Sequence, residues 1–183
     1  MTRIIPSLAA ISEQYEALFV DLWGCVHNGI AALPEAVAAL QSYRAHGGTV
    51  VLVTNSPRPR VGVEAQLKHF GVPDDAWDSI ATSGDSARAA MFQSVVGKRV
   101  YFIGLPHDLP FFDPIHVVSN PVEITRVALD EAEGIVCTGP FDGTVDPTVL
   151  LPDLRLAQRN GLKLLCANPD LVVDRGTRRE WCA

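Results

Sequence analysis

Two apolar stretches of this sequence end in residues that could do chemistry. The segment VDLWGCVHNG (residues 20–29) closes an apolar run with Asp21 and then passes through two glycines. The second run, TVVLVTN (residues 49–55), ends in Thr54 and Asn55. A carboxylate at the end of a strand can act as a nucleophile or bind a metal. A hydroxyl and an amide beside the start of a helix favour binding of an anion such as phosphate.

One carboxylate and one phosphate-sized anion site on neighbouring strands together predict phosphoryl transfer. The reaction would pass through an aspartyl intermediate at Asp21 and would use Mg²⁺. A simpler interpretation stays open, because an Asp after a strand often caps a helix or forms a turn. The sequence TNS before Pro57 is likewise a good capping sequence.

The elements that would position these residues alternate between strand and helix. Continuous apolar runs predict strands at 17–23 and 49–55, and helical patterns predict helices at 34–48 and 57–71. This order predicts a parallel sheet covered by helices on both faces, in the α/β class. In such sheets, ligands bind beyond the carboxyl ends of the strands, where Asp21 would lie.

The rest of the chain also alternates between strand and helix patterns, with a weakly marked domain boundary near residues 80–85. Further elements are predicted as strands at 98–104, 115–119, 134–139 and 162–168, and as helices at 84–97 and 147–161.

Composition bounds the functions that this chain can have. Its 183 residues suit one large domain or two small ones, and a net charge of −6 gives no general attraction to nucleic acid or to a membrane. The start lacks the pattern of a signal peptide, and no apolar run approaches the roughly 20 residues of a membrane span. The four cysteines lack metal-type spacing and fit free thiols in a reducing cytoplasm. No G-x-G-x-x-G follows the first strand and no P-loop is present, which argues against nucleotide-binding modules of those kinds.

Three segments in order resemble the motifs of the haloacid dehalogenase (HAD) superfamily. FVDLWGCVHNG resembles its first motif and VLVTNSPRP its second. LLCANPDLVVDRG (residues 164–176) is similar to the segment by which members with an α/β cap return to their core. Members with this cap form class IIA, which contains NagD-like and 4-nitrophenylphosphatase-like enzymes. Within class IIA, the sequence DLWG (residues 21–24) is similar to that of one subgroup.

The resemblance implies a HAD-like Rossmannoid core with a parallel sheet and an inserted α/β cap domain. Residues 1–81 would form the first part of the core, 82–167 the cap, and 168–183 the re-entry into the core. It also implies a Mg-dependent hydrolase of a small phosphorylated metabolite, in a branch whose members often form homodimers.

Site roles follow from the resemblance position by position. Asp21 would be the nucleophile and a Mg²⁺ ligand, with the backbone carbonyl of Trp23 as a second ligand. Thr54 would hold the transferring phosphoryl group, with Asn55 beside it. Arg58 would meet a substrate anion or, in the simpler interpretation, be a solvated arginine in the first turn of a helix.

The segment Asn168-Pro169-Asp170 would mark the re-entry to the core, where Asp170 would brace the loop.

Trp23 is the first departure from the family pattern, which has a second Asp at this position to protonate the leaving oxygen. An indole N–H donates a hydrogen bond but no proton at neutral pH. Because general acid catalysis contributes about 10²–10⁴ in rate, we expect weak activity on alkyl phosphates. Substrates with good leaving groups, or another displacement at Asp21, remain compatible, as does an indole that merely packs under the cap. His27 is an alternative acid and Cys25 a weaker alternative nucleophile.

The second departure is that the lysine of the third motif and the acids of the fourth would lie beyond residue 183. Neither Lys163 nor Asp174 is placed to replace them. We therefore expect the sequence to be a piece of a longer protein, poorly stable and inactive by itself. A non-catalytic metabolite-binding or regulatory module with this fold is the alternative function, and Trp23 favours it.

Overall fold

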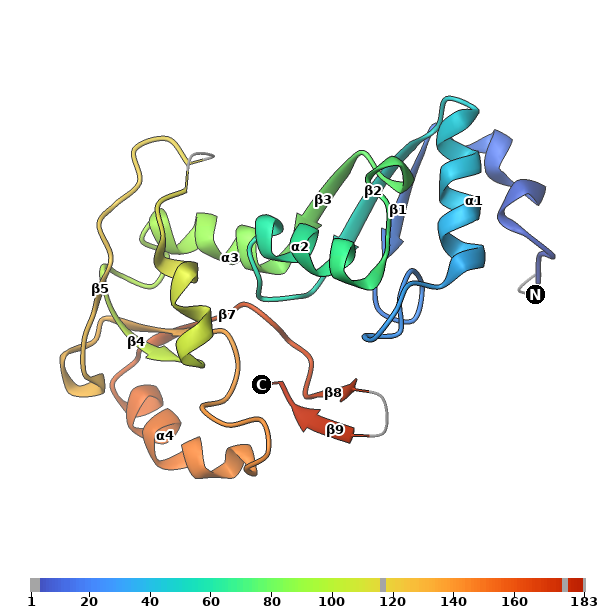
Figure 1. Cartoon of the computed structure of the whole chain (residues 1–183). Coiled ribbons are helices and arrows are strands. Elements are labelled where there is room, and N and C mark those ends of the chain that lie inside the picture. Colours follow the sequence, from blue (N-terminus) through green and yellow to red (C-terminus); the bar gives the residue numbers. More distant parts are fainter. Residues whose placement is uncertain (1–3, 116–117, 176–177, 183) are drawn as a thin grey trace. The chain divides into compact units, whose positions relative to one another are not determined.

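The computed structural model describes residues 4–115, 118–175 and 178–182. The chain forms two compact units, which are described separately (Figure 1). The first unit is Met1–Thr54 with Val61–Ala81, and the second is Asn55–Arg60 with Thr82–Ala183.

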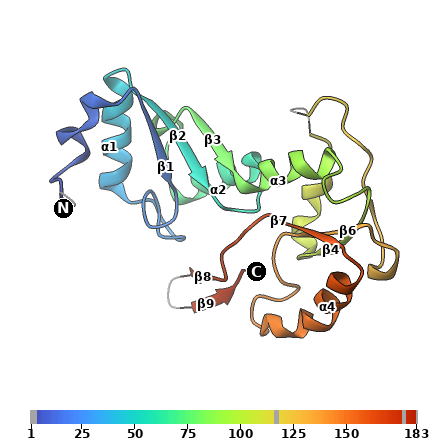
Figure 2. The same cartoon turned by 180° about the vertical axis from the view of Figure 1, so that it is seen from behind.

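The sheet of the first unit has the strand order β1-β2-β3, with the three strands side by side (Figure 2). They are β1 (Ala17–Asp21), β2 (Thr49–Thr54) and β3 (Ser79–Thr82). The central strand β2 buries Val50 and Leu52 completely. An apolar strand between two neighbours is therefore the centre of this core, as a parallel α/β sheet requires.

β1 and β2 run parallel in a register that sets the geometry of the candidate site. Ala17 lies opposite Thr49, and Asp21 lies opposite Val53. Among the described residues β1 is an edge strand, and its Phe19 is 78% exposed.

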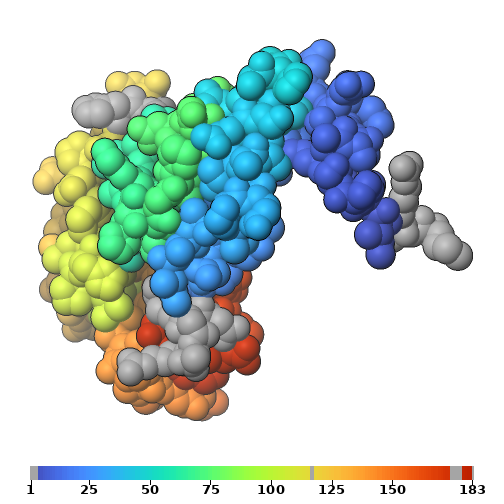
Figure 3. Space-filling model, turned by 45° about the vertical axis from the view of Figure 1, so that its right-hand side comes forward, coloured from blue at the N-terminus to red at the C-terminus, as the bar shows by residue number. Residues whose placement is uncertain are grey.

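Two helices connect these strands. α1 (Pro34–Ala45) follows β1, and α2 (Arg60–Phe70) follows β2. Pro34 occupies the start of α1, with Glu35 in the first turn and Arg44 in the last. This arrangement matches the fixed φ of proline and the polarity of the helix dipole. The N-terminal turns of the chain lie against the side of α1 (Figure 3).

The second unit contains a sheet with the strand order β5-β4-β6-β7. Each neighbouring pair runs parallel. The strands are β4 (Arg99–Ile103), β5 (Thr125–Arg126), β6 (Gly134–Cys137) and β7 (Lys163–Cys166).

Helices and a hairpin complete the second unit. The helices are α3 (Ser83–Phe92) and α4 (Leu151–Arg159), and α3 packs Met91 into the same core as residues of β4 and β6. β8 (Val172–Arg175) and β9 (Arg178–Trp181) form an antiparallel pair (Figure 2).

Short 3₁₀ turns link the larger elements at Leu8–Ala10, Ser12–Gln14, Asp74–Ala76, Pro106–Phe112, Leu129–Glu131 and Pro147–Leu150.

The predicted α/β class with parallel sheets is confirmed, and the element boundaries differ in detail. The helix predicted from residue 57 begins at Arg60, because Pro57 and Pro59 restrict the residues before them. The strand predicted at 115–119 falls partly on residues 116–117, outside the described residues, and the described positions around them form no strand. Within the described parts of the chain, every helix is too short or too polar to cross a membrane.

Candidate functional site

Asp21 and Thr54 lie at the same edge of the sheet in the first unit. Asp21 is the last residue of β1 and pairs in register with Val53, so Thr54 follows at the carboxyl end of the adjacent parallel strand. The Asp21 side chain is exposed, and its Oδ1 accepts a hydrogen bond from the Leu22 N–H at 2.8 Å. An exposed carboxylate and a hydroxyl at this edge form the arrangement expected for phosphoryl transfer.

The loop after Asp21 turns back on itself around one carbonyl group. The Leu22 oxygen accepts backbone hydrogen bonds from Cys25 at 3.3 Å, Val26 at 2.9 Å and His27 at 3.1 Å. Gly24 adopts φ +74°, in the left-handed region that glycine accepts without strain. This compact turn places the residues of the loop close to the candidate nucleophile.

Trp23 is held inside this loop by Gly29 and His27. A Cβ on Gly29 would lie only 2.3 Å from the indole Cη2, so the ring rests directly on the glycine backbone. The indole and the His27 imidazole meet edge to face, with ring centroids 5.6 Å apart and planes at 78°. Trp23 therefore occupies a defined position two residues after Asp21 and remains partly exposed.

His27 is 3% exposed and is neutral in this environment. Its Nδ1 accepts a hydrogen bond from the Gly29 N–H at 3.1 Å, which assigns the proton to Nε2. Burial lowers the pKa of His27, and the nearby negative charge of Asp21 opposes this effect. The ring also packs on Phe70, with centroids 4.8 Å apart. A buried neutral imidazole of this kind packs and accepts hydrogen bonds, and this geometry disfavours His27 as a replacement acid.

Asn55 belongs to the second unit, where residues of the predicted re-entry segment bind it. Its Nδ2 donates a hydrogen bond to the Asn168 Oδ1 at 3.3 Å and another to the Asp170 carboxylate. The Asp170 N–H also donates to the Asn168 Oδ1, at 3.1 Å. The structure thus brings Asn55 together with two predicted residues that lie more than a hundred positions later in the chain.

The loop with Arg58 is fixed by a hydrogen bond within the loop and by backbone contacts to the start of α3. The Arg58 N–H donates to the Ser56 Oγ at 3.3 Å, and the Gly84 N–H donates to the Ser56 carbonyl at 3.0 Å. A Cβ on Gly84 would lie 2.2 Å from the Pro57 carbonyl oxygen. The sequence analysis did not identify Gly84 as a residue that positions this loop. The signal that could have indicated it is a glycine in the sequence Ser-Gly-Asp at the start of a helix.

The donor groups at Asp21 would supply only some of the ligands that Mg²⁺ needs. The described residues contain no group of three His, Cys, Asp or Glu side chains that could hold a metal ion. Mg²⁺, however, is commonly bound by one or two carboxylates together with water and substrate phosphate. The exposed Asp21 carboxylate suits that mode of binding.

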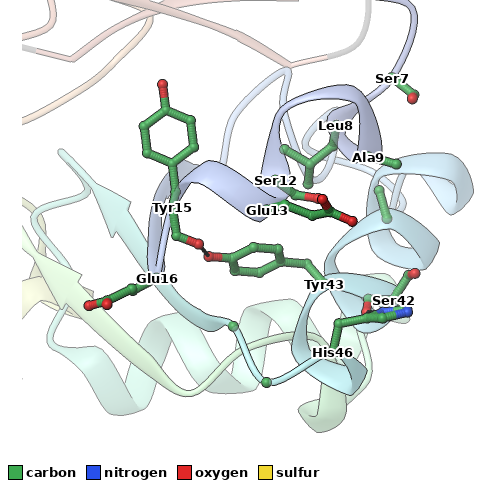
Figure 4. A pocket seen from close by; sticks show the side chains of 13 residues that line it. Ser7, Leu8, Ala9, Ser12, Glu13, Tyr15, Glu16, Ser42, Tyr43 and His46 are labelled. Carbon is green, nitrogen blue, oxygen red and sulfur yellow. Dashed lines mark hydrogen bonds between the residues drawn. The ribbon is translucent and has the colours of Figure 1, made fainter.

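A cavity of about 490 Å³ lies at the opposite end of the same unit (Figure 4). It is lined by the N-terminal turns and the end of α1, and the Tyr43 hydroxyl donates to the Tyr15 carbonyl at 2.6 Å beside it. Because Glu16 in its lining precedes β1, this cavity faces the amino ends of the strands. Asp21 lies at the carboxyl ends, so the cavity is separate from the candidate site.

Comparisons with known proteins identify a family for this chain. The family model described as "Haloacid dehalogenase-like hydrolase" matches residues 18–115. A search of curated proteins found no significant match.

Among solved structures, a haloacid dehalogenase-like hydrolase from Brucella suis is 39% identical, with a TM-score of 0.88, and the match covers 98% of this chain and 66% of that chain. A 4-nitrophenylphosphatase from Thermotoga maritima is 20% identical, with a TM-score of 0.67 and coverages of 94% and 62%. A glycerol phosphate phosphatase from Mycobacterium tuberculosis, in complex with magnesium, is 23% identical, with a TM-score of 0.66 and coverages of 94% and 50%.

The last two likenesses show the fold alone. The chain spans less than two thirds of the length of each of these three proteins.

Proposed function

The chain belongs to the haloacid dehalogenase-like hydrolase family, and from this membership we propose that the whole protein hydrolyses a phosphate ester of a small metabolite. The observation that supports this most is the position of Asp21 opposite Val53, with Thr54 next on the adjacent strand. The phosphatase names of the structural relatives from Thermotoga maritima and Mycobacterium tuberculosis agree with the proposal.

Asp21 is the proposed nucleophile. Its carboxylate oxygen attacks phosphorus, and the bond between phosphorus and the ester oxygen breaks with its electron pair on that oxygen. Water then hydrolyses the aspartyl phosphate, which releases phosphate and restores the carboxylate. Thr54 would hold the transferring group through its hydroxyl. Asn55 and Arg58 are proposed to contribute to substrate binding from the loop that follows.

Mg²⁺ is the proposed cofactor, held by the Asp21 carboxylate and the Trp23 backbone carbonyl. When bound, this ion would neutralise charge on the phosphoryl group. The relative from Mycobacterium tuberculosis was solved in complex with magnesium, which supports this choice.

Further parts of the proposal concern the surroundings of the site. We propose that residues 82–167 act as the cap that selects the substrate. The cytoplasm is the proposed location, in keeping with the free cysteines of the described chain. We expect a small-molecule partner, no nucleic acid or membrane partner, and a homodimer.

The test is a phosphatase assay of the full-length protein with Mg²⁺ and a panel of aryl and alkyl phosphates. We expect turnover that Asp21→Asn abolishes, because the amide cannot form the phosphoenzyme. Trp23→Asp should raise turnover of alkyl phosphates by about 10²-fold, since a carboxyl group can donate a proton to the leaving oxygen. Turnover that persists at full rate in Asp21→Asn would contradict the proposal.

A non-catalytic metabolite-binding or regulatory module is the second candidate function, and Trp23 is the observation that favours it. In that case a phosphorylated metabolite would bind equally well to the parent protein and to Asp21→Asn. Neither the parent protein nor Trp23→Asp would then release phosphate.

A further inference from the structure

The loop after Asp21 presents a fixed aromatic surface beside the candidate nucleophile. The chain turns around the Leu22 carbonyl, which accepts hydrogen bonds from residues 25–27. Trp23 lies in this turn, two positions after Asp21. The indole lies in the same compact unit as both Asp21 and Thr54. Any substrate whose phosphorus reaches Asp21 therefore has its ester group close to this loop.

Two neighbours contact the indole and hold it in place. Gly29 supports the benzo ring, with an ideal Cβ position 2.3 Å from Cη2, 2.8 Å from Cζ2 and 2.9 Å from Cζ3. His27 meets the indole edge to face. His27 is itself buried and fixed by the Gly29 N–H and by Phe70.

The indole is held in this way and is still partly exposed, so part of this fixed side chain remains open to a ligand. Aromatic side chains bind flat rings by stacking, with contributions that do not depend on hydrogen bonding. Because the ring is already fixed, stacking costs little conformational entropy.

The chemistry of the leaving group favours the same class of substrate. An indole N–H gives no proton to a departing oxygen. A phenol has a pKa of roughly 10, so a phenolate oxygen departs without protonation more easily than an alkoxide, whose conjugate acid is nearly as weak as water at roughly 15.7. The leaving oxygen takes its proton from water after the bond to phosphorus has broken.

We propose that Trp23 is a specificity-determining residue that selects phosphate esters of flat aromatic alcohols by stacking on the leaving group. This inference rests on the proposed function for the reaction step, and it makes a separate statement about binding. The two statements can therefore fail independently.

Phenyl phosphate and cyclohexyl phosphate are matched probes, because both carry six ring carbons and one phosphate. Binding is measured by calorimetry with full-length protein carrying Asp21→Asn, so that no turnover disturbs the titration. We expect phenyl phosphate to bind about tenfold more tightly. Adding Trp23→Leu should reduce this preference to less than about twofold, whereas Trp23→Phe should keep most of it.

Two glycine variants test whether the held position of the ring matters. Gly29→Ala forces the indole to move, and Gly24→Ala is its matched control. Both glycines have positive φ, +83° and +74°, but a Cβ on Gly24 meets nothing within 4 Å. We expect the preference for phenyl phosphate to be lost in Gly29→Ala and retained in Gly24→Ala.

Several outcomes would overturn the inference. These are equal binding of the two probes, no binding of either, a preference that persists in Trp23→Leu, or the same effect from both glycine variants. A protein that binds phenyl phosphate selectively through Trp23 but hydrolyses neither ester would overturn the proposed function and support this inference. A protein that hydrolyses both esters equally well through Asp21 would support the proposed function and overturn this inference.

Discussion

The cysteines of this chain differ in their surroundings, and their reactivity should differ accordingly. Cys25 is exposed in the loop after β1. Cys137 ends β6, beside Cys166 in register on β7. Burial raises the pKa of the Cys137 thiol to about 11, and the neighbouring Cys166 and Asp108 add to the effect. Since the thiolate is the reactive form, Cys137 should be nearly inert at neutral pH.

Alkylation by iodoacetamide measures this difference. At pH 8 we expect Cys137 to react about a hundredfold more slowly than Cys25. The rate at Cys137 should rise about tenfold for each pH unit and level off near pH 11, because the raised pKa keeps the thiol protonated below that value. Mass spectrometry of digested protein identifies the labelled residue, and equal rates at the two positions would contradict the expectation.

At the scale of elements, the backbone of the loop at 55–60 is joined to α3 by side-chain and backbone contacts. The Arg60 N–H donates to the Asp85 Oδ2 at 2.9 Å, and the Gly84 backbone approaches the Pro57 carbonyl too closely for any side chain. The first turn of α3 therefore determines where the loop after β2 can lie.

Gly84→Ala should disturb this contact. The new methyl group would collide with a backbone oxygen, and such overpacking costs typically about 1–3 kcal/mol. We expect a lower free energy of unfolding in urea and weaker binding of phosphate esters. Ser83→Ala, in the same turn, is the control and should change stability by less than about 0.5 kcal/mol. Unchanged stability in Gly84→Ala would show that the loop relaxes without cost.

Sequence patterns predicted the long elements well and the short polar ones poorly. The apolar runs at 17–23 and 49–55 contain β1 and β2, and each strand ends slightly earlier than its apolar run. β3 has only four residues, two of which are polar, so it lacks the continuous apolar pattern that would predict a strand. β8 and β9 escaped prediction because their charged residues indicate a loop and only their pairing with each other makes them strands.

At the scale of the whole molecule, contacts between distant positions in the chain complete the second unit. The Asn55 side chain and Asp170 are 115 positions apart and share a hydrogen bond. Sequence motifs marked both residues, but no pattern in the sequence states that they touch, because the contact depends on how the strands between them are ordered. The same holds for Gly29, whose support of the indole follows from the turn of the loop.

Asp170→Ala should weaken the second unit. Loss of the hydrogen bond to Asn55 removes a charged acceptor from an exposed amide, and a hydrogen bond of this kind contributes about 0.5–1.5 kcal/mol. We expect a lower thermal unfolding temperature, measured by circular dichroism. Asp130→Ala removes an exposed carboxylate from a short turn and should leave the unfolding temperature within about 1 °C. An equal effect of the two substitutions would show that the contact with Asn55 contributes nothing specific.

The division of the chain has one further consequence at the end of β2. Thr54 belongs to the first unit, and Asn55, the next residue, belongs to the second. The same division crosses the chain twice more, between residues 60 and 61 and between residues 81 and 82. Thr54 is therefore positioned by β2, whereas the side chain of Asn55 is positioned by Asn168 and Asp170 of the second unit.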